Sequence, residues 1–147
     1  MKIKIFALTH KKFEVPQDKM YQPLQVGREE KEDLGYFCDN TGDNISAENC
    51  YYSELTGLYW IWKNVHTYKY VGTCHYRRYL LNEQEKIFTE AEYLKLLKDY
   101  DLITTKRVVL NNSYHYGFAT NHNIHALDMT GEVIKELYPE YYDTFVQ

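Results

Sequence analysis

The sequence predicts an α/β fold in which a mostly parallel central sheet is flanked by helices. Short apolar runs alternate with longer segments of helical periodicity, in the order strand, strand, helix, strand, helix, strand. Such alternation is typical of parallel sheets, because two parallel strands need a crossover connection that is usually a helix. Polar and basic residues follow several expected strands, and ligands of open α/β sheets gather at these carboxyl ends.

The expected strands are short and bounded by turn or polar residues. The first covers residues 2–8 (KIKIFAL), where Ile3, Ile5 and Ala7 alternate on one side. The others are residues 21–26 (YQPLQV), 70–74 (YVGTC) and 101–105 (DLITT), and we expect the last two to be buried. After the second strand, an acidic segment over residues 29–33 (EEKED) is expected to be solvated. Residues 34–45, which follow it, are rich in Gly, Asp and Asn and are expected to form a loop.

The strongest expected helix lies within residues 46–65. Its apolar residues recur at i, i+3, i+4 and i+7, and they are Leu55, Leu58, Tyr59 and Trp62. We expect this face, widened by Trp60 and Ile61, to pack into the core. The residues near the helix start, where a side chain could reach a ligand or only cap the helix, are Ser53, Glu54 and Thr56.

The second half of the chain is expected to be mainly helical. A capping-box pattern at residues 89–92 (TEAE) starts a helix that continues to about Lys98. Asp128 is expected to cap a helix over residues 129–137. The other expected helices are residues 113–125 and residues 139–145.

The clearest candidate binding segment follows the expected strand at residues 70–74. His75, Arg77 and Arg78 come directly after the apolar run, and no Asp or Glu occurs between Lys63 and Leu81. Cations without a local counter-ion at a strand end are suited to an anion, and we interpret them as the site of a nucleotide-linked diphosphate. Two alternatives stay open: one arginine could be solvated, or either could pair with a carboxylate elsewhere.

Further candidates lie in three other segments. Thr9, His10 and Lys11 follow the first strand, so they form a second polar and basic strand exit. Asp39 and Asp43 could contact a metal or a ribose, or they could accept hydrogen bonds from loop amides. The remaining candidates are Asn44 in the same loop and His122, which we expect to share a helix face with His125. No third metal ligand is evident beside the two histidines.

Composition limits the classes of function. A chain of 147 residues with 44% hydrophobic residues can form one domain, which we place at residues 1–147. Its net charge of -4 argues against nucleic acid as a partner. Three widely spaced cysteines indicate reduced thiols and a cytoplasmic location. No signal peptide is expected, and no apolar run approaches the roughly 20 residues of a membrane helix.

Several segments together resemble a bacterial family found in capsule and exopolysaccharide gene clusters, a domain of unknown function grouped with GT-A glycosyltransferases. The most specific of these are TGDNIS (residues 41–46), ELTGLYWIWKN (residues 54–64) and YVGTCHYRRYL (residues 70–80). The weaker matches are IFALTHK (5–11), YQPLQVG (21–27), HNIHALD (122–128) and PEY (139–141). They follow the family's order along nearly the whole chain.

The resemblance implies a GT-A-like nucleotide-diphospho-sugar transferase fold. It implies transfer of a sugar, from UDP most often, to a glycan or lipid-linked acceptor in capsular, exopolysaccharide or lipopolysaccharide biosynthesis. Related enzymes hold a divalent metal with an Asp-x-Asp motif, which is absent here after any expected strand, so His75-Tyr76-Arg77 is similar in position to its replacement. Thr9, His10 and Lys11 match the loop that contacts the nucleotide, and a metal requirement stays open.

The same resemblance raises a question about the acceptor side. The family usually continues beyond PEY, whereas this sequence stops at Gln147, so we expect the donor-binding part of a truncated GT-A-like domain. We therefore name no catalytic residue, and activity of this chain alone is an open question. A non-catalytic glycan- or partner-binding module that kept the fold is the alternative. Because the implied acceptor can be lipid-linked, peripheral association with a membrane also stays an open question.

Overall fold

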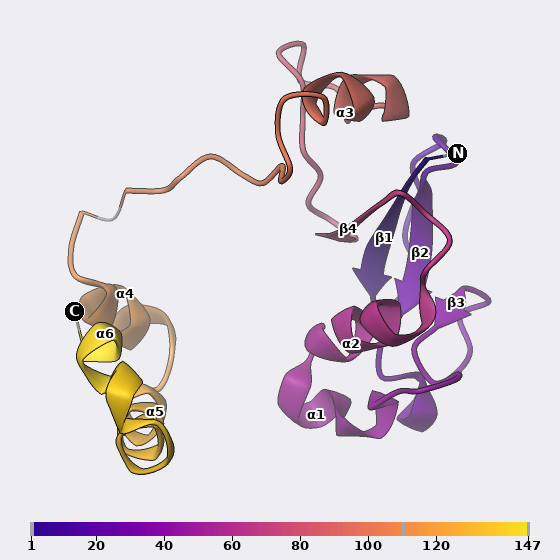
Figure 1. The fold of residues 1–147 in the computed structure, drawn as a ribbon. Helices are drawn as coiled ribbons and strands as arrows, with labels where there is room; N and C mark the ends of the chain where they lie inside the picture. Colours follow the sequence, from indigo (N-terminus) through magenta and orange to yellow (C-terminus); the bar gives the residue numbers. More distant parts are fainter. Residues whose placement is uncertain (1, 110, 147) are drawn as a thin grey trace. The chain divides into compact units, whose positions relative to one another are not determined.

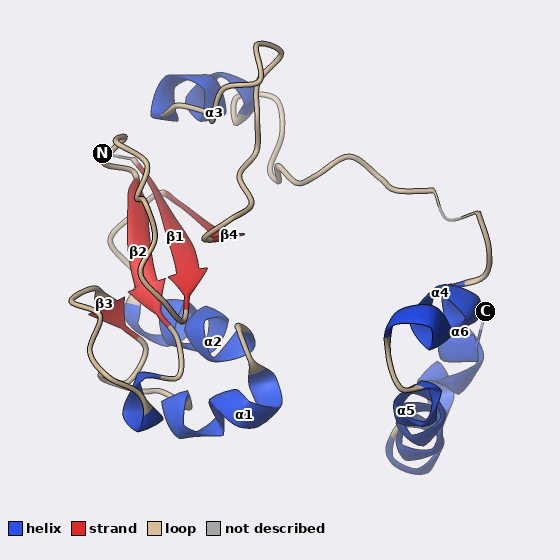
Figure 2. Ribbon diagram, turned by 180° about the vertical axis from the view of Figure 1, so that it is seen from behind, coloured by secondary structure: helices blue, strands red, loops and turns tan. Residues whose placement is uncertain are grey.

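The computed structural model describes residues 2–109 and 111–146, which fall into two compact units, Met1–Thr105 and Lys106–Gln147. The first unit contains the sheet and its helices, and the second is helical (Figures 1 and 2). The expectation of one domain over residues 1–147 stays a prediction.

The sheet has four strands, and every pairing is parallel. Its strands are β1 (Ile3–Thr9), β2 (Tyr21–Gln25), β3 (Phe37–Cys38) and β4 (Tyr70–His75), in the spatial order β3-β2-β1-β4. All seven residues of β1 are buried, as expected of an inner strand. The predicted α/β class, with a mostly parallel sheet flanked by helices, is confirmed. The predicted loop at residues 34–45 also contains β3, whose two residues are too few to show a periodic pattern.

Helices cover the two faces of the sheet, because successive side chains of a strand point to opposite faces. Phe6 and Leu8 of β1 pack with Trp60 and Ile61 of α2 (Leu55–Asn64) on one face. On the other face, the alternate β1 residues, Ile3 and Ile5, pack with Tyr93 of α3 (Glu90–Leu96). The capping box predicted for α3 is present: the Thr89 hydroxyl accepts from the Glu92 amide, and the Glu92 carboxylate accepts from the Thr89 amide.

The apolar face predicted for α2 is confirmed for Trp60 and Ile61, which are buried, and was wrong for Leu55, Leu58 and Trp62. Thr56, Gly57, Trp60 and Ile61 are the buried residues of α2. The exposed fractions of the expected core residues are 57% for Leu55, 45% for Leu58 and 66% for Trp62. Gly57 explains the difference, since its missing side chain lets the helix approach Val26 and Leu8 closely.

Residues 46–65 contain the expected helix, α2, as one of three helical pieces. These are η2 (Ser46–Glu48), α1 (Asn49–Tyr52) and α2. The interruption is at Ser53, whose φ of 49° is unusual for a residue with a side chain.

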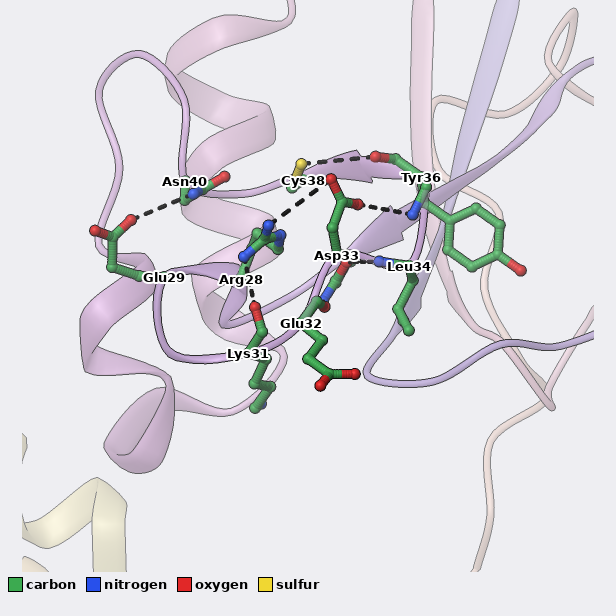
Figure 3. Close-up of polar contacts among 11 residues, drawn as sticks. Arg28, Glu29, Lys31, Glu32, Asp33, Leu34, Tyr36, Cys38 and Asn40 are labelled. Atoms are coloured by element: carbon green, nitrogen blue, oxygen red, sulfur yellow. Dashed lines mark hydrogen bonds and ion pairs between the residues drawn. The ribbon is translucent and has the colours of Figure 1, made fainter.

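Between β2 and β3, the acidic segment forms a surface loop around η1 (Arg28–Glu30), which is held by local contacts (Figure 3). The Arg28 guanidinium donates to the Lys31 carbonyl and lies 3.7 Å from the Asp33 carboxylate. The predicted solvated character of this segment is therefore confirmed, with its charges largely exposed.

Two predictions about the far edge of the sheet were wrong. The segment at residues 70–74 was expected to be buried, whereas β4 is an edge strand in the described chain, with Val71 41% exposed. Residues 101–105 were expected to be a strand, but they form no ladder in the described part of the chain. Their β-favouring composition cannot by itself supply a hydrogen-bonding partner.

The second unit consists of α4 (Tyr114–Asn121), α5 (Ile124–Leu137), η3 (Pro139–Tyr141) and α6 (Tyr142–Val146). The predicted boundary at Asp128 was wrong: Asn123 caps α5 by accepting from the His125 amide, and Asp128 lies inside that helix. No helix among the described residues is long and apolar enough to cross a membrane.

Candidate functional site

The exits of β1 and β4 are adjacent because the two strands are parallel neighbours. Leu8 of β1 lies opposite His75 of β4, and the amide of Tyr76 donates to the Leu8 carbonyl at 3.2 Å. The loop that starts at Thr9 and the segment that starts at His75 therefore leave the same edge of the sheet side by side. The two basic strand exits singled out in the sequence meet at this edge.

Three cationic or titratable side chains surround the buried ring of Tyr76. The His10 ring packs edge-on at 5.6 Å between centroids, the Lys11 ammonium lies 5.6 Å from the Tyr76 centroid, and the Arg77 guanidinium lies 5.0 Å from it. We call His10, Lys11, Arg77 and the ring of Tyr76 the Tyr76 cluster. The face of an aromatic ring attracts cations, so Tyr76 can hold the Lys11 ammonium and the Arg77 guanidinium close together without neutralising them.

Thr9 shapes the loop that carries this charge. Its hydroxyl donates to the Lys11 carbonyl and accepts from the Lys11 amide, whose nitrogen lies 3.1 Å away. The side chain of Thr9 is 1% exposed, so it positions His10 and Lys11 rather than reaching solvent itself.

His75 is fixed at both ring nitrogens. Nδ1 accepts from the Arg77 amide at 3.2 Å, and Nε2 lies 3.3 Å from Oε1 of Glu54. Because Nδ1 accepts, the neutral ring carries its proton on Nε2, where it can donate to Glu54. Burial lowers the pKa of His75, Arg77, Arg78 and His10 lower it further, and the Glu54 carboxylate opposes this shift.

Arg78 lies at a cleft along β4. The cleft has a volume of about 880 Å³, and among its lining residues are Glu54, Leu58, Trp62, Thr73, His75 and Arg78. Arg77 and Arg78 are both exposed, and within the described chain neither has an acidic side chain within 4.0 Å. The alternative in which an acidic residue neutralises one of them is therefore not observed among these residues.

Asp39 has a structural environment. Its carboxylate is 0% exposed and accepts from the Gly27 amide at 2.8 Å and the Arg28 amide at 3.1 Å. It also accepts from the hydroxyls of Ser46 and Thr56, both at 2.6 Å. With four donors and no exposed surface, Asp39 holds loops together in this conformation. Of the two roles considered for it, this is acceptance of hydrogen bonds within the loops and not contact with a metal or a ribose.

Asp43 and Asn44 also make contacts within their loop. The Asp43 carboxylate accepts from the Tyr59 hydroxyl at 3.0 Å and lies 3.8 Å from the Lys63 ammonium. Asn44 accepts from the Ser46 amide at 3.1 Å and donates to the Gly42 carbonyl at 3.0 Å. Asp43 is exposed, so its second carboxylate oxygen keeps room for another donor.

His122 belongs to the helical unit. It ends α4, where its amide donates to the Phe118 carbonyl at 2.8 Å, and its ring packs 4.9 Å from Phe118. The predicted shared helix face with His125 is wrong, because His125 lies in α5. Among the described residues, no three His, Cys, Asp or Glu side chains come together as a metal site, and the metal requirement stays an open question.

Two residues of this region were not selected from the sequence. Glu54 was noted only as one of three residues near a helix start that could reach a ligand or cap the helix, and Tyr76 only as part of the family motif. The contacts of Glu54 with His75, and of Tyr76 with His10 and Lys11, join segments that are distant in sequence. The acid-free sequence around His75 could have prompted a search for its missing carboxylate partner.

Comparison with known proteins gives a family and a solved relative. The family model described as a domain of unknown function, DUF4422, matches residues 4–147. The chain belongs to this DUF4422 family. It is also similar to the apo structure of the bifunctional glycosyltransferase WbbM, with a TM-score of 0.77 and 28% sequence identity. The match covers 96% of this chain and 30% of the WbbM chain, and no curated protein matches. The DUF4422 chain is thus similar to part of a glycosyltransferase, consistent with the expected GT-A-like fold.

Proposed function

We propose that this DUF4422 chain is the sugar-donor-binding part of a glycosyltransferase, and that the exits of β1 and β4 bind the diphosphate of a nucleotide-sugar. The observation that carries the proposal is the convergence of His10, Lys11 and Arg77 on Tyr76 at the carboxyl edge of a parallel sheet. That edge is where ligands of such sheets bind. Several classes of protein bind a diphosphate at such an edge, and the similarity to WbbM favours a glycosyltransferase among them.

The chemistry that this chain can supply is electrostatic. As the bond between the sugar and the diphosphate breaks, negative charge grows on the leaving phosphate oxygens. Arg77, Arg78 and Lys11 can stabilise that charge, and a guanidinium can bind two phosphate oxygens at once. Catalysis depends on this stabilisation being stronger in the transition state than in the ground state.

The finer parts of the proposal follow from the family resemblance. UDP is the expected nucleotide, and the acceptor is a glycan or a lipid-linked glycan of capsular, exopolysaccharide or lipopolysaccharide biosynthesis. The reaction would then take place in the cytoplasm, with peripheral association to a membrane where the acceptor is lipid-linked.

Calorimetric titration of the chain with UDP and UDP-sugars tests the proposal. The double variant Arg77→Ala/Arg78→Ala should weaken binding at least about tenfold, because charged hydrogen bonds to phosphate contribute about 1.5–3 kcal/mol each. Lys95→Ala/Lys98→Ala removes the same charge from exposed positions around the end of α3 and should leave affinity nearly unchanged. A folded wild-type chain that binds neither UDP nor any UDP-sugar would refute the proposal.

A second function, a non-catalytic glycan-binding module, is favoured by one observation. The α2 side of the cleft presents Trp62, which is 66% exposed, and exposed aromatic rings can stack on sugars. Binding of glycans with no affinity for nucleotides, and loss of that binding in Trp62→Ala, would favour this module over the transferase.

A further inference from the structure

We propose that Glu54 binds a hydroxyl group of the donor's sugar, and that His75 is the positioning residue that orients its carboxylate. The inference rests on the proposed nucleotide-sugar site and adds a residue that discriminates the sugar-linked nucleotide from the free nucleotide.

Glu54 is placed next to the phosphate-binding cations. It lines the cleft along β4, its side chain is 51% exposed, and Oε1 lies 3.3 Å from Nε2 of His75. His75 directs an N–H group at this oxygen, because its other nitrogen is occupied by the Arg77 amide. One carboxylate oxygen of Glu54 is therefore oriented by His75, and its other oxygen can accept a hydrogen bond from a ligand in the cleft.

Electrostatics decides which part of the ligand Glu54 can contact. A carboxylate repels a phosphate at short range, so the diphosphate should lie toward Arg77 and Lys11. The sugar is the next group along the donor, and its hydroxyls are hydrogen-bond donors that a carboxylate accepts well. A carboxylate beside a cationic phosphate site is thus suited to the sugar.

The backbone that carries Glu54 is strained and fixed. Ser53, immediately before it, has φ 49° and ψ -123°, a conformation that is unfavourable for a residue with a side chain. The Ser53 carbonyl accepts from the Asn49 side chain at 2.6 Å, and the same side chain donates to the Thr56 hydroxyl at 3.1 Å. Thr56 is in turn bonded to the buried Asp39 carboxylate. Strain that neighbouring contacts maintain is common at binding sites, and here it sets the start of α2 where Glu54 meets His75.

The test compares dissociation constants for UDP, UDP-glucose and UDP-galactose, measured by calorimetry on the whole chain. Glu54→Gln keeps the shape but weakens the acceptor, so affinity for the preferred UDP-sugar should fall about five- to tenfold. Affinity for UDP itself should stay the same or rise, since a negative charge near the phosphates is removed. Glu48→Gln removes an equal charge from exposed η2 and should change none of the constants.

Variants of His75 separate positioning from simple folding. His75→Gln keeps an N–H group near the place of Nε2, so it should retain the preference for UDP-sugar over UDP. His75→Asn places its amide near Nδ1 instead and should lose that preference. If Glu54→Gln changes UDP and UDP-sugar affinity equally, or changes neither, the inference is overturned while the phosphate site stands. If the wild type binds no nucleotide at all, the proposed function itself fails.

Discussion

The hydroxyl oxygen of Thr56 lies 2.6 Å from a carboxylate oxygen of Asp39, and both side chains are 0% exposed. This contact joins the loop after β3 to the first turn of α2. Since the same carboxylate accepts two backbone amides and the Ser46 hydroxyl, one charged group organises three separate segments. Asp39 therefore contributes to the candidate site by holding Ser53 and Glu54 in place, although it is not exposed to a ligand.

Removing this carboxylate should destabilise the first unit strongly. Asp39→Ala leaves four donors, whose hydrogen bonds are buried or partly buried, without their acceptor, so the free energy of unfolding should fall by about 3–5 kcal/mol. Thr56→Val keeps the volume and loses one hydroxyl, which should cost about 1–2 kcal/mol. Denaturant unfolding followed by the fluorescence of Trp60 and Trp62 measures both changes. Exposed Asp43→Ala is the control, and an equal loss there would contradict the assignment.

Gly57 should not tolerate a side chain. A Cβ atom at this position would lie 2.7 Å from Cγ1 of Val26 and 2.9 Å from Cδ2 of Leu8, both in the core under α2. Gly57→Ala should therefore cost about 1–3 kcal/mol despite the better helix propensity of alanine. Gly72→Ala is the matched control, because its Cβ would meet only Ile5, at 3.4 Å. If the double variant Gly57→Ala/Val26→Ala recovers stability, the clash lies between the added Cβ atom and the Val26 side chain.

A pair of Tyr→Phe substitutions should change stability in opposite directions. The Tyr76 hydroxyl is buried and has no hydrogen-bond partner among the described residues, whereas the Tyr21 hydroxyl donates to the Phe88 carbonyl at 3.0 Å. Tyr76→Phe removes an unsatisfied polar group and should raise the free energy of unfolding by up to about 1 kcal/mol. Tyr21→Phe should lower it by about the same amount. A loss in both variants would indicate that the Tyr76 hydroxyl has a partner in solution.

The three thiols should differ in reactivity. Burial raises the pKa of Cys74 to about 12, so at neutral pH this thiol has almost no thiolate, the reactive form. Cys50 is exposed in α1 and should react first with iodoacetamide, well before Cys74. Mass spectrometry of the alkylated protein measures the order, and modification of Cys74 at the rate of Cys50 would contradict the described packing of β4.

The central strand and its neighbours could be predicted from sequence because local patterns define them. The alternation in β1, the β-favouring residues of β4 and the capping box of α3 each depend on residues close in the chain. The burial of Thr56 and Gly57 in α2 could not be predicted in this way. It depends on the close approach that Gly57 allows, which a helical pattern of apolar residues does not reveal. The unpaired residues 101–105 show the same limit, since a strand needs a partner as well as suitable residues.

In the candidate site, too, some features could be predicted from the sequence and others could not. The basic exits at Lys11 and Arg77 were predictable, because parallel strands end at one edge of a sheet. The contact of Glu54 with His75 was not, since it joins two residues that are distant in sequence and follows the unusual backbone conformation at Ser53.

Nucleotide-sugar binding should strengthen as the pH falls. In the free protein the pKa of His75 lies below its usual value of 6.5, because burial and the neighbouring Arg77, Arg78 and His10 disfavour the charged ring. A bound diphosphate supplies negative charge and should raise that pKa, so the complex binds more protons than the free protein and affinity increases below about pH 6.5.

The folding stability of the unliganded protein should instead decrease as the pH falls. A lowered pKa means that the unfolded state takes up the proton first, so the contribution of His75 to folding is present above pH 6.5 and is lost as the pH falls through the folded-state pKa.

Affinity for a UDP-sugar, whose diphosphate charge is constant over this range, should rise several-fold between pH 7.5 and about 5.5. His75→Gln should remove most of this dependence. An unchanged pH profile in His75→Gln would place the titrating group elsewhere and remove His75 from the phosphate site.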